Sequence, residues 1–322
     1  MRQIFLLGFV LFSAFLFGCA DSSDNLTKTK IPSEDNFVSK AYFCQKDNCA
    51  DVFLRYLDNA NKSIHCSLYN IDLKYVKSKL AEKSSLIDVK IVFNGVNYKN
   101  QLSGSNVRLT KRTDHNKFCI IDGNIILSGS FNPTSSDNKS MNNIVAILSK
   151  YLAENYEAEF DEQWNNMKDS PTKNKEITLG GKKITNLFCP DDNCKKYVSD
   201  IMKNANESIY LIVYSFTDED IADILLTTKV HVAGVFDDAQ AKGRYSQYQR
   251  IKDFGLDVNT DNTKATLHHK VIIIDRKIVI TGSMNPTSNG FSGNDENVLI
   301  IEDNETAMEF LKEFSRIYYT AR

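Results

Sequence analysis

"TLHHKVIIIDRKIVITGSMNPTSNG", residues 266–290, indicates how the chain is organised, because a close copy, "TDHNKFCIIDGNIILSGSFNPTSSD", occupies residues 113–137. In each copy a His-x-Lys opens an apolar run, and a second apolar run leads to Gly-Ser-x-Asn. Both runs have the length of strands, and the segment between them has the length of a turn. Two copies of one long phrase in a single chain indicate an internal duplication.

The duplication extends over most of the chain. "FCQKDNC" at residues 43–49 returns as "FCPDDNC" at residues 188–194. Cys44 and Cys189 are 145 residues apart, whereas His115 and His268 are 153 apart, so the second half holds 8 extra residues in between. We expect these extra residues within the segment 237–250.

Each half is predicted to contain the same elements in the same order. The expected ranges are helices 49–59 and 194–204, strands 63–69 and 208–214, helices 73–83 and 218–227, strands 88–93 and 230–236, strand pairs 118–128 and 271–281, and last strands 144–148 and 298–301, each half ending in a helix. The fold class is therefore α/β, with two tandem repeats that each place helices against a mixed sheet. We expect domains at residues 37–166 and 184–322, joined by a polar linker at residues 167–183.

The overall composition is that of a globular protein, with 42% hydrophobic and 25% charged residues. The formal net charge is −2, so the chain carries no overall field that would attract nucleic acid or an anionic membrane. Binding to a polyanion would need a local patch. The basic residues that are candidates for such a patch are Lys111, Arg112, Lys139, Lys242, Arg244 and Arg250.

The N-terminal segment predicts export. One early Arg precedes an apolar run from Ile4 to Phe17, which is too short to span a membrane comfortably, and Gly18-Cys19 follows. Residues 16–19 resemble a bacterial lipobox, so we expect a signal peptide at 1–18, a lipidated Cys19 and a tether to residue 36. Acyl chains would then anchor an exported lipoprotein to a membrane, facing the periplasm or the cell surface. An ordinary cleaved signal or an uncleaved anchor is the alternative.

Six further cysteines remain. In an exported protein the pairs Cys44–Cys49 and Cys189–Cys194 are expected to be local disulfides. A zinc site made by these four residues is the alternative. Cys66 and Cys119 lie in apolar runs and are expected to be plain core residues.

The motif residues suit a phosphate group. Strand alternation places His115 and Lys117 on one face, as it does His268 and Lys270. After Gly129 and Gly282, a Ser and an Asn alternate onto one face in the same way; we expect these four residues, Ser130, Asn132, Ser283 and Asn285, to bind phosphate. Two halves placed face to face would set two histidines across one phosphate, one to attack phosphorus and one to protonate the leaving oxygen.

The doubled pattern His-x-Lys-x₄-Asp-x₆-Gly-Ser-x-Asn resembles the phospholipase D superfamily, and its small bacterial nuclease-like branch in particular. The resemblance implies a phosphodiesterase with a covalent phosphohistidine intermediate, no metal and no other cofactor. It also implies a site on the pseudo-two-fold axis between the halves, and structural roles for Asp122 and Asp275. A monomer would suffice, because one chain holds both half-sites.

The halves differ after the second motif, where Glu296 stands in one half and Asn142 in the other. In the superfamily an acidic residue near this point bonds the motif histidine, and a carboxylate favours the imidazolium. Our hypothesis is that His268, supported by Glu296, donates the proton, and that His115 is the nucleophile.

The substrate does not follow from the chemistry alone. The compact halves favour a nuclease acting on DNA or RNA. The alternative is a phospholipase D or phosphatidyl transferase that acts on membrane phospholipids. A third interpretation is a tethered nucleic-acid-binding scaffold that keeps the fold without turnover.

Overall fold

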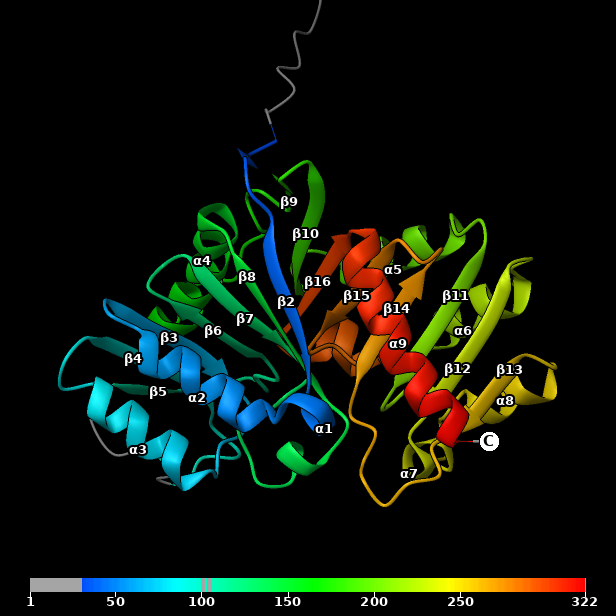
Figure 1. Ribbon diagram of the computed structural model, residues 1–322, viewed down its shortest axis with the longest axis horizontal. Coiled ribbons are helices and arrows are strands. Elements are labelled where there is room, and N and C mark those ends of the chain that lie inside the picture. The colour runs from blue at the N-terminus through cyan, green and yellow to red at the C-terminus, as the bar shows by residue number, and fades with distance from the viewer. Residues whose placement is uncertain (1–30, 100–101, 103–105, 322) are drawn as a thin grey trace, which may run out of the picture. The chain divides into compact units, whose positions relative to one another are not determined.

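Two mixed sheets, one from each repeat, form the framework (Figure 1). The computed structural model describes residues 31–99, 102 and 106–321, so the predicted signal peptide and Cys19 lie outside the described residues. No helix in this described part is both long enough and apolar enough to cross a membrane.

The first sheet has seven strands in the order β2-β8-β7-β6-β3-β4-β5. Its strands are β2 (Val38–Phe43), β3 (Ser63–Leu68), β4 (Asp88–Asn94), β5 (Val107–Thr110), β6 (Lys117–Ile121), β7 (Ile125–Gly129) and β8 (Asn143–Leu148), and its helices are α1 (Cys44–Asp47), α2 (Cys49–Asn59), α3 (Lys74–Lys83) and α4 (Lys150–Asn165), with a 3₁₀ turn η1 (Asp137–Lys139). Strands β3, β4 and β5 are parallel, and the others pair antiparallel.

The second sheet repeats this order and adds an edge, giving β1-β9-β10-β16-β15-β14-β11-β12-β13. Its strands are β1 (Ser33–Glu34), β9 (Glu176–Leu179), β10 (Lys182–Cys189), β11 (Ser208–Val213), β12 (His231–Phe236), β13 (Asp257–Thr260), β14 (Lys270–Ile274), β15 (Ile278–Gly282) and β16 (Glu296–Glu302). Its helices are α5 (Cys194–Lys203), α6 (Glu219–Thr227), α7 (Asp238–Ala241), α8 (Tyr248–Asp253) and α9 (Asn304–Thr320), with a π turn η2 (Asn289–Gly293). The extra residues of this half lie between β12 and β13 and include α7 and α8, the second of which extends past the expected segment 237–250.

Three hydrophobic cores hold the layers together. The core under α2 and α3 belongs to the first repeat, and the core under α5 and α6 belongs to the second. The third core lies between the repeats and contains the inner faces of both sheets with α4 and α9. Continuous apolar strands such as β14, "KVIII", are buried on both faces, as this layered arrangement requires. The repeats therefore share one core and hold their facing strand ends rigidly together.

Two predicted boundaries are wrong. The segment 167–183 is not only a linker, because β9 and the start of β10 lie within it and pair with each other. The expected tether also ends too late, since β1 pairs with β9. Within β1 the Glu34 carboxylate accepts hydrogen bonds from Ser149 Oγ (2.5 Å) and the Tyr151 amide (3.0 Å), at the start of α4.

The cysteines form three disulfides within the described residues. Two are the local pairs Cys44–Cys49 and Cys189–Cys194, and no zinc site forms from these four residues. The third joins Cys66 to Cys119, so the prediction of two separate core cysteines is wrong. These two residues lie directly opposite each other on the paired strands β3 and β6, which brings their side chains within bonding distance.

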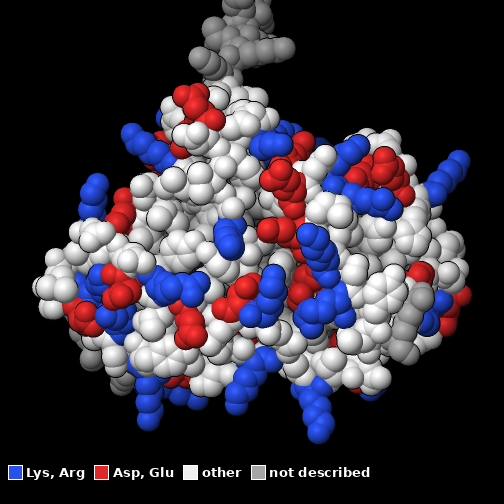
Figure 2. Space-filling view, in the orientation of Figure 1, with Lys and Arg blue, Asp and Glu red and all other residues white. Residues whose placement is uncertain are grey.

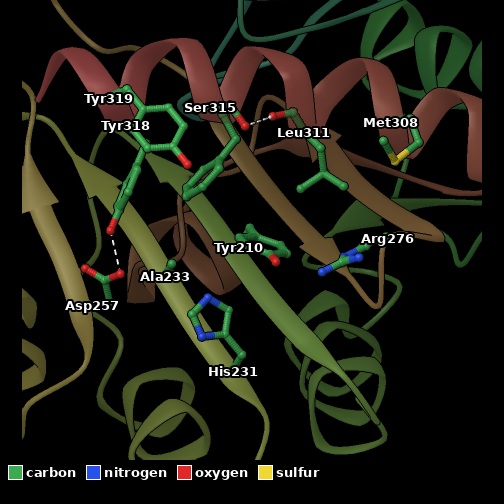
Figure 3. A pocket seen from close by; sticks show the side chains of 11 residues that line it. Tyr210, His231, Ala233, Asp257, Arg276, Met308, Leu311, Ser315, Tyr318 and Tyr319 are labelled. Atoms are coloured by element: carbon green, nitrogen blue, oxygen red, sulfur yellow. Dashed lines mark hydrogen bonds between the residues drawn. The ribbon is translucent and has the colours of Figure 1, made fainter.

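A pocket of about 420 Å³ in the second repeat lies between α9 and the strands β11, β12 and β13 (Figure 3). Figure 3 shows Tyr210, Tyr318 and Tyr319 around it, with His231 and Arg276 at its side. In the first repeat His65 stands in the place of Tyr210 and forms ion pairs with Glu157 (2.7 Å) and Asp88 (3.2 Å). The two repeats thus keep the fold but differ in how this face is covered.

Candidate active site

The two His-x-Lys segments meet where the repeats face each other. The His115 amide donates to the Asp295 carbonyl of the other repeat (2.9 Å), and the His268 amide donates to the Met141 carbonyl (2.9 Å). Lys117 and Lys270 are the first residues of β6 and β14. Backbone bonds across the interface therefore fix the position of each histidine relative to the opposite half.

Each histidine bonds a side chain of the other repeat through Nδ1. His115 Nδ1 lies 2.8 Å from both carboxylate oxygens of Glu296, and His268 Nδ1 lies 2.8 Å from Asn142 Oδ1. Since Nδ1–H donates in both cases, the free nitrogen is Nε2 on each ring. The hypothesis that Glu296 supports His268 is wrong, because the side chain that follows a motif crosses to the histidine of the other half.

The serines of the Gly-Ser-x-Asn motifs lie beneath these partners. Ser130 Oγ donates to Asn142 Oδ1 (2.8 Å), and Ser283 Oγ donates to Glu296 Oε2 (2.6 Å). Both serines are fully buried. The prediction that they bind phosphate is therefore wrong, and their hydroxyls hold the side chains that orient the histidines.

The glycines before these serines allow the close approach. Gly129 and Gly282 have φ values of 147° and 135°. A Cβ on Gly282 would lie 2.3 Å from the Asn297 carbonyl oxygen, which no side chain tolerates. Glycine is therefore required for the serine to reach across to β16.

The motif asparagines are placed differently in the two halves. Asn132 Nδ2 donates to Asp137 Oδ2 (2.7 Å), and this carboxylate lies 3.6 Å from His268 Nδ1. The residue corresponding to Asp137 in the second half is Gly290, so no such carboxylate stands beside Asn285. Asn285 is therefore the asparagine whose amide is better placed to donate to a ligand.

The lysines are buried beside the histidines of their own strands. Lys117 Nζ donates to the His115 carbonyl, and Lys270 Nζ donates to the His268 carbonyl, both at 2.7 Å. Burial lowers the pKa of Lys117 to about 8, against the effect of Glu296, Asp137 and Asp114. Burial and the charge of Lys117 also lower the pKa of Lys270. Two ammonium groups held together without water form a strong site for an anion.

Burial also governs the acid–base groups. The pKa values of His115 and His268 lie well below the ordinary value, first because of burial and then because of the two lysines. Burial raises the pKa of Glu296 to about 7. Both histidines are therefore neutral in the free protein at pH 7, with Nε2 ready to accept a proton or attack an electrophile.

Asp122 and Asp275 occupy the turns between the paired strands, as the resemblance implied. The Asp122 carboxylate accepts from the amides of residues 61, 62 and 63, at 2.7–3.1 Å. Asp275 does the same with the amides of residues 206, 207 and 208. Burial alone would raise their pKa values, but these amides lower them below the ordinary range. Both residues connect the motif hairpin to the strand beside it.

Three of the six basic residues proposed as a groove form ion pairs with acidic side chains. Arg112 lies 3.2 Å from Asp295 and 3.3 Å from Asp169. Lys242 pairs with Asp238, and Arg250 pairs with Asp223. These pairs leave less free positive charge around the site than the sequence predicted.

Several residues of the site escaped sequence reasoning. Asp137 and the buried Asp114, whose pKa burial raises to about 6, belong to no duplicated pattern. Tyr69 and Tyr214 also border the histidines. The tyrosines could have been identified from the sequence, because they occupy equivalent positions in "SLYNID" and "IVYSFT", 145 residues apart.

Comparison with known proteins gives the same organisation. A family model described as "Cardiolipin synthase, PLD-like domain" matches residues 53–164 and 198–318, which together make up most of the chain. Over 133 residues the chain is 37% identical to "Phospholipase D" of Rickettsia felis, covering 40% of this chain and 66% of the relative. The chain thus spans just under two thirds of that relative's length.

Two solved structures are also similar. Phosphatidylserine synthase of Haemophilus influenzae has a TM-score of 0.67 at 12% identity, over 88% of each chain, and so shares the fold. Nuc of Salmonella typhimurium, a phospholipase D family member, is 30% identical, with a TM-score of 0.42, over 44% of this chain and 97% of its own.

Proposed function

The chain belongs to the phospholipase D superfamily of phosphodiesterases, and on that premise we propose that it hydrolyses nucleic acid without a metal, through a phosphohistidine on His115. The observation that carries the proposal is the pair of His-Lys clusters facing each other with unequal partners, Glu296 on one histidine and Asn142 on the other.

The first step is attack by Nε2 of His115 on phosphorus. The bond between phosphorus and the leaving oxygen breaks, and that oxygen takes a proton from His268. Lys117 and Lys270 bind the non-bridging oxygens and stabilise the charge of the transition state. Asn285 donates an additional hydrogen bond.

The second step reverses the roles. His268, now neutral, takes a proton from a water molecule whose oxygen attacks phosphorus. The bond between phosphorus and His115 breaks, and the phosphate product leaves. His268 regains the proton that it gave away, so the cycle is balanced.

The unequal partners support these roles for the two histidines. A phosphorylated imidazole that keeps its Nδ1–H is cationic throughout the life of the intermediate, and the carboxylate of Glu296 stabilises that charge. His268 must release its proton in the first step, and a neutral amide at 2.8 Å hinders release less than a carboxylate would. The approaching phosphate and Asp137 favour the protonated form of His268 before the reaction.

The surroundings of the site favour nucleic acid. Large apolar side chains exposed in the described residues, such as Leu86, Leu109 and Phe254, lie on different parts of the chain, and the exposed Val38 and Leu148 are opposite each other on β2 and β8. On the face in Figure 2, acidic and basic side chains are interspersed. The side chains of His115 and His268 are only 13% and 14% exposed. The sugar–phosphate backbone of a bound nucleic acid must therefore bend toward them. A single strand bends more easily than a duplex, and we expect it to be the better substrate.

A second candidate is a phospholipid phosphodiesterase. It is favoured by the 37% identity to a Rickettsia protein named phospholipase D. The predicted lipid anchor would also keep such an enzyme beside its substrate.

The test uses the chain from residue 20 onward in EDTA, with single-stranded DNA, duplex DNA and phospholipid vesicles as parallel substrates. The proposal expects DNA cleavage that His115→Asn abolishes, with the single strand cleaved faster. Release of head groups from vesicles while DNA stays intact would support the second candidate and overturn the first.

A further inference from the structure

A tyrosine stands beside each half-site in an equivalent position. The rings of Tyr69 and His115 have centroids 4.7 Å apart and meet edge to face. Tyr214 and His268 do the same at 4.8 Å. Neither tyrosine belongs to the His-x-Lys or Gly-Ser-x-Asn motifs, and both are half-buried.

Each tyrosine ring also lies under the lysine of its own half. Lys117 Nζ is 5.0 Å from the centroid of the Tyr69 ring, and Lys270 Nζ is 5.1 Å from that of Tyr214. One ring in each half therefore contacts both groups that carry positive charge during the reaction. The repetition of this contact in two halves of different surrounding sequence argues against a chance arrangement.

The backbone fixes these rings relative to the motifs. The Tyr69 amide donates to the Asn116 carbonyl (3.0 Å), and the Tyr214 amide donates to the His269 carbonyl (2.9 Å). Asn116 and His269 are the residues between the histidine and the lysine of each motif. Each ring thus moves with the His-x-Lys segment of its own half.

The contact has a physical consequence for the lysines. The face of an aromatic ring carries negative charge density and attracts a cation, an interaction worth about 0.5–2 kcal/mol that strengthens when water is excluded. Lys117 and Lys270 are both buried, at 4% exposure, so they have few water molecules to stabilise the ammonium form. The ring faces replace part of that lost hydration.

We propose that Tyr69 and Tyr214 are positioning residues that keep Lys117 and Lys270 protonated and hold the rings of His115 and His268 in their reactive orientation. The catalytic part of this inference rests on the proposed function, whereas the effect on the lysines does not. The ring performs the role, and the hydroxyl is dispensable, although Gln240 Nε2 donates to the Tyr214 hydroxyl (3.2 Å).

Other charged groups act on the same lysines. Those that face them are Glu296 on β16, Asp137 on η1, Asp114 before β6, Asp237 before α7, and the opposite lysine. All of them remain in place when a tyrosine is replaced. A change in the pKa of Lys117 or Lys270 on substitution of the adjacent tyrosine is therefore caused by loss of the aromatic ring.

The experiment compares Tyr69→Phe and Tyr69→Leu, and likewise Tyr214→Phe and Tyr214→Leu. The lysine pKa values are measured in the free protein by NMR of ¹³C-lysine. In parallel, kcat/KM for bis(p-nitrophenyl) phosphate is measured against pH in EDTA. Tyr210→Leu is the matched control, because Tyr210 contacts a histidine, His231, outside the site (5.7 Å).

We expect each Leu variant to lower the pKa of the adjacent lysine by about 0.5–1. The decline of kcat/KM on the basic side should then begin at a correspondingly lower pH. The maximal kcat/KM should fall about 10-fold. The Phe variants and Tyr210→Leu should resemble the wild type in both measurements.

Two results would overturn the proposal. One is a Leu variant that loses activity while both the lysine pKa and the basic limb stay unchanged, because the tyrosine would then act only on folding. The other is a Phe variant that loses as much as the Leu variant. If the wild type cleaves no phosphodiester at all, the proposed function fails, and the lysine titration still decides the effect of the rings.

Discussion

The two half-sites have the same motif and different neighbours. His115 bonds a carboxylate, Glu296, whereas His268 bonds an amide, Asn142, and the two partners occupy equivalent places in the duplicated halves. Buried serines support both partners in the same way. In the mechanism that we propose, this difference in side-chain charge suits His115 to hold a phosphoryl group and His268 to release a proton.

The backbone bridges beside the half-sites differ in the same manner. Asp114 and Asp295 face each other at the bridge next to His115, and Met141 and Leu267 do so at the bridge next to His268. Burial raises the pKa of Asp295 to about 7, and nearby Asp114 adds to this effect. The backbone bridge beside His115 thus joins two acidic residues, whereas the bridge beside His268 joins two apolar residues.

The largest effect is expected from replacing either histidine by Asn. On a substrate with an alcohol leaving group, both His115→Asn and His268→Asn should lower kcat by about 10³-fold or more. On an aryl phosphodiester, whose leaving group needs no proton, His268→Asn should still release one equivalent of p-nitrophenol rapidly and then stop. His115→Asn should give no burst. A burst from His115→Asn and none from His268→Asn would reverse the roles.

Removal of the carboxylate should have the next largest effect. Glu296→Gln leaves the shape and deletes the charge that stabilises the phosphorylated ring, so we expect kcat to fall about 10²-fold. Asn294→Ala is the control, because Asn294 donates to Glu296 Oε1 (3.1 Å) and its loss leaves the carboxylate in place. Both variants are measured by steady-state kinetics. Equal losses of kcat would show that the negative charge of Glu296 beside His115 is unimportant.

The third comparison concerns stability. The first half has a disulfide between β3 and β6, Cys66–Cys119, where the second half has Leu211 and Ile272. Replacing the pair with the residues of the second half, Cys66→Leu with Cys119→Ile, should lower the free energy of unfolding by about 2–4 kcal/mol. Denaturant unfolding measures this difference. A variant as stable as the wild type would mean that packing alone holds these strands.

The smallest effect is a shift of the pH profile. Burial lowers the pKa of Lys117 to about 8, and its protonated form binds phosphate. We therefore expect kcat/KM to fall on the basic side of the profile, at a pH no higher than about 8. Lys117→Arg keeps the charge, so its basic limb should shift toward the titration of Lys270. Lys117→Met removes the repulsion and should raise the pKa of Lys270, measured by NMR. An unchanged Lys270 pKa in this variant would show that the two lysines do not interact.

The sequence predicted the repeats and their central strands well, because the two copies of the motif can be compared with each other. Lys117 and Lys270 begin β6 and β14, and Asp122 and Asp275 lie in the turns that follow these strands. Prediction failed wherever contacts cross between the halves. Glu296 follows the second motif along the chain, yet it bonds the first histidine, and local spacing contains no information about that crossing.

The same limit explains the other errors. The serine hydroxyls donate hydrogen bonds to side chains 12 and 13 positions further along the chain. These side chains come within reach only when β7 pairs with β8 and β15 pairs with β16. The Cys66–Cys119 disulfide depends on the register of β3 against β6. The strand β1 was missed because its partner, β9, lies in a polar segment without a strand pattern.

The most direct measurement is the identity of the phosphorylated residue. The chain is mixed with an aryl phosphodiester, quenched in alkali or denaturant within milliseconds, digested and analysed by mass spectrometry, with His268→Asn used to accumulate the intermediate. We expect an aryl phosphoryl group, which keeps the second ester of the substrate, on the peptide that contains His115 and none on the peptide that contains His268. The aryl phosphoryl group on His268 in the wild type would contradict the assignment drawn from Glu296 and Asn142.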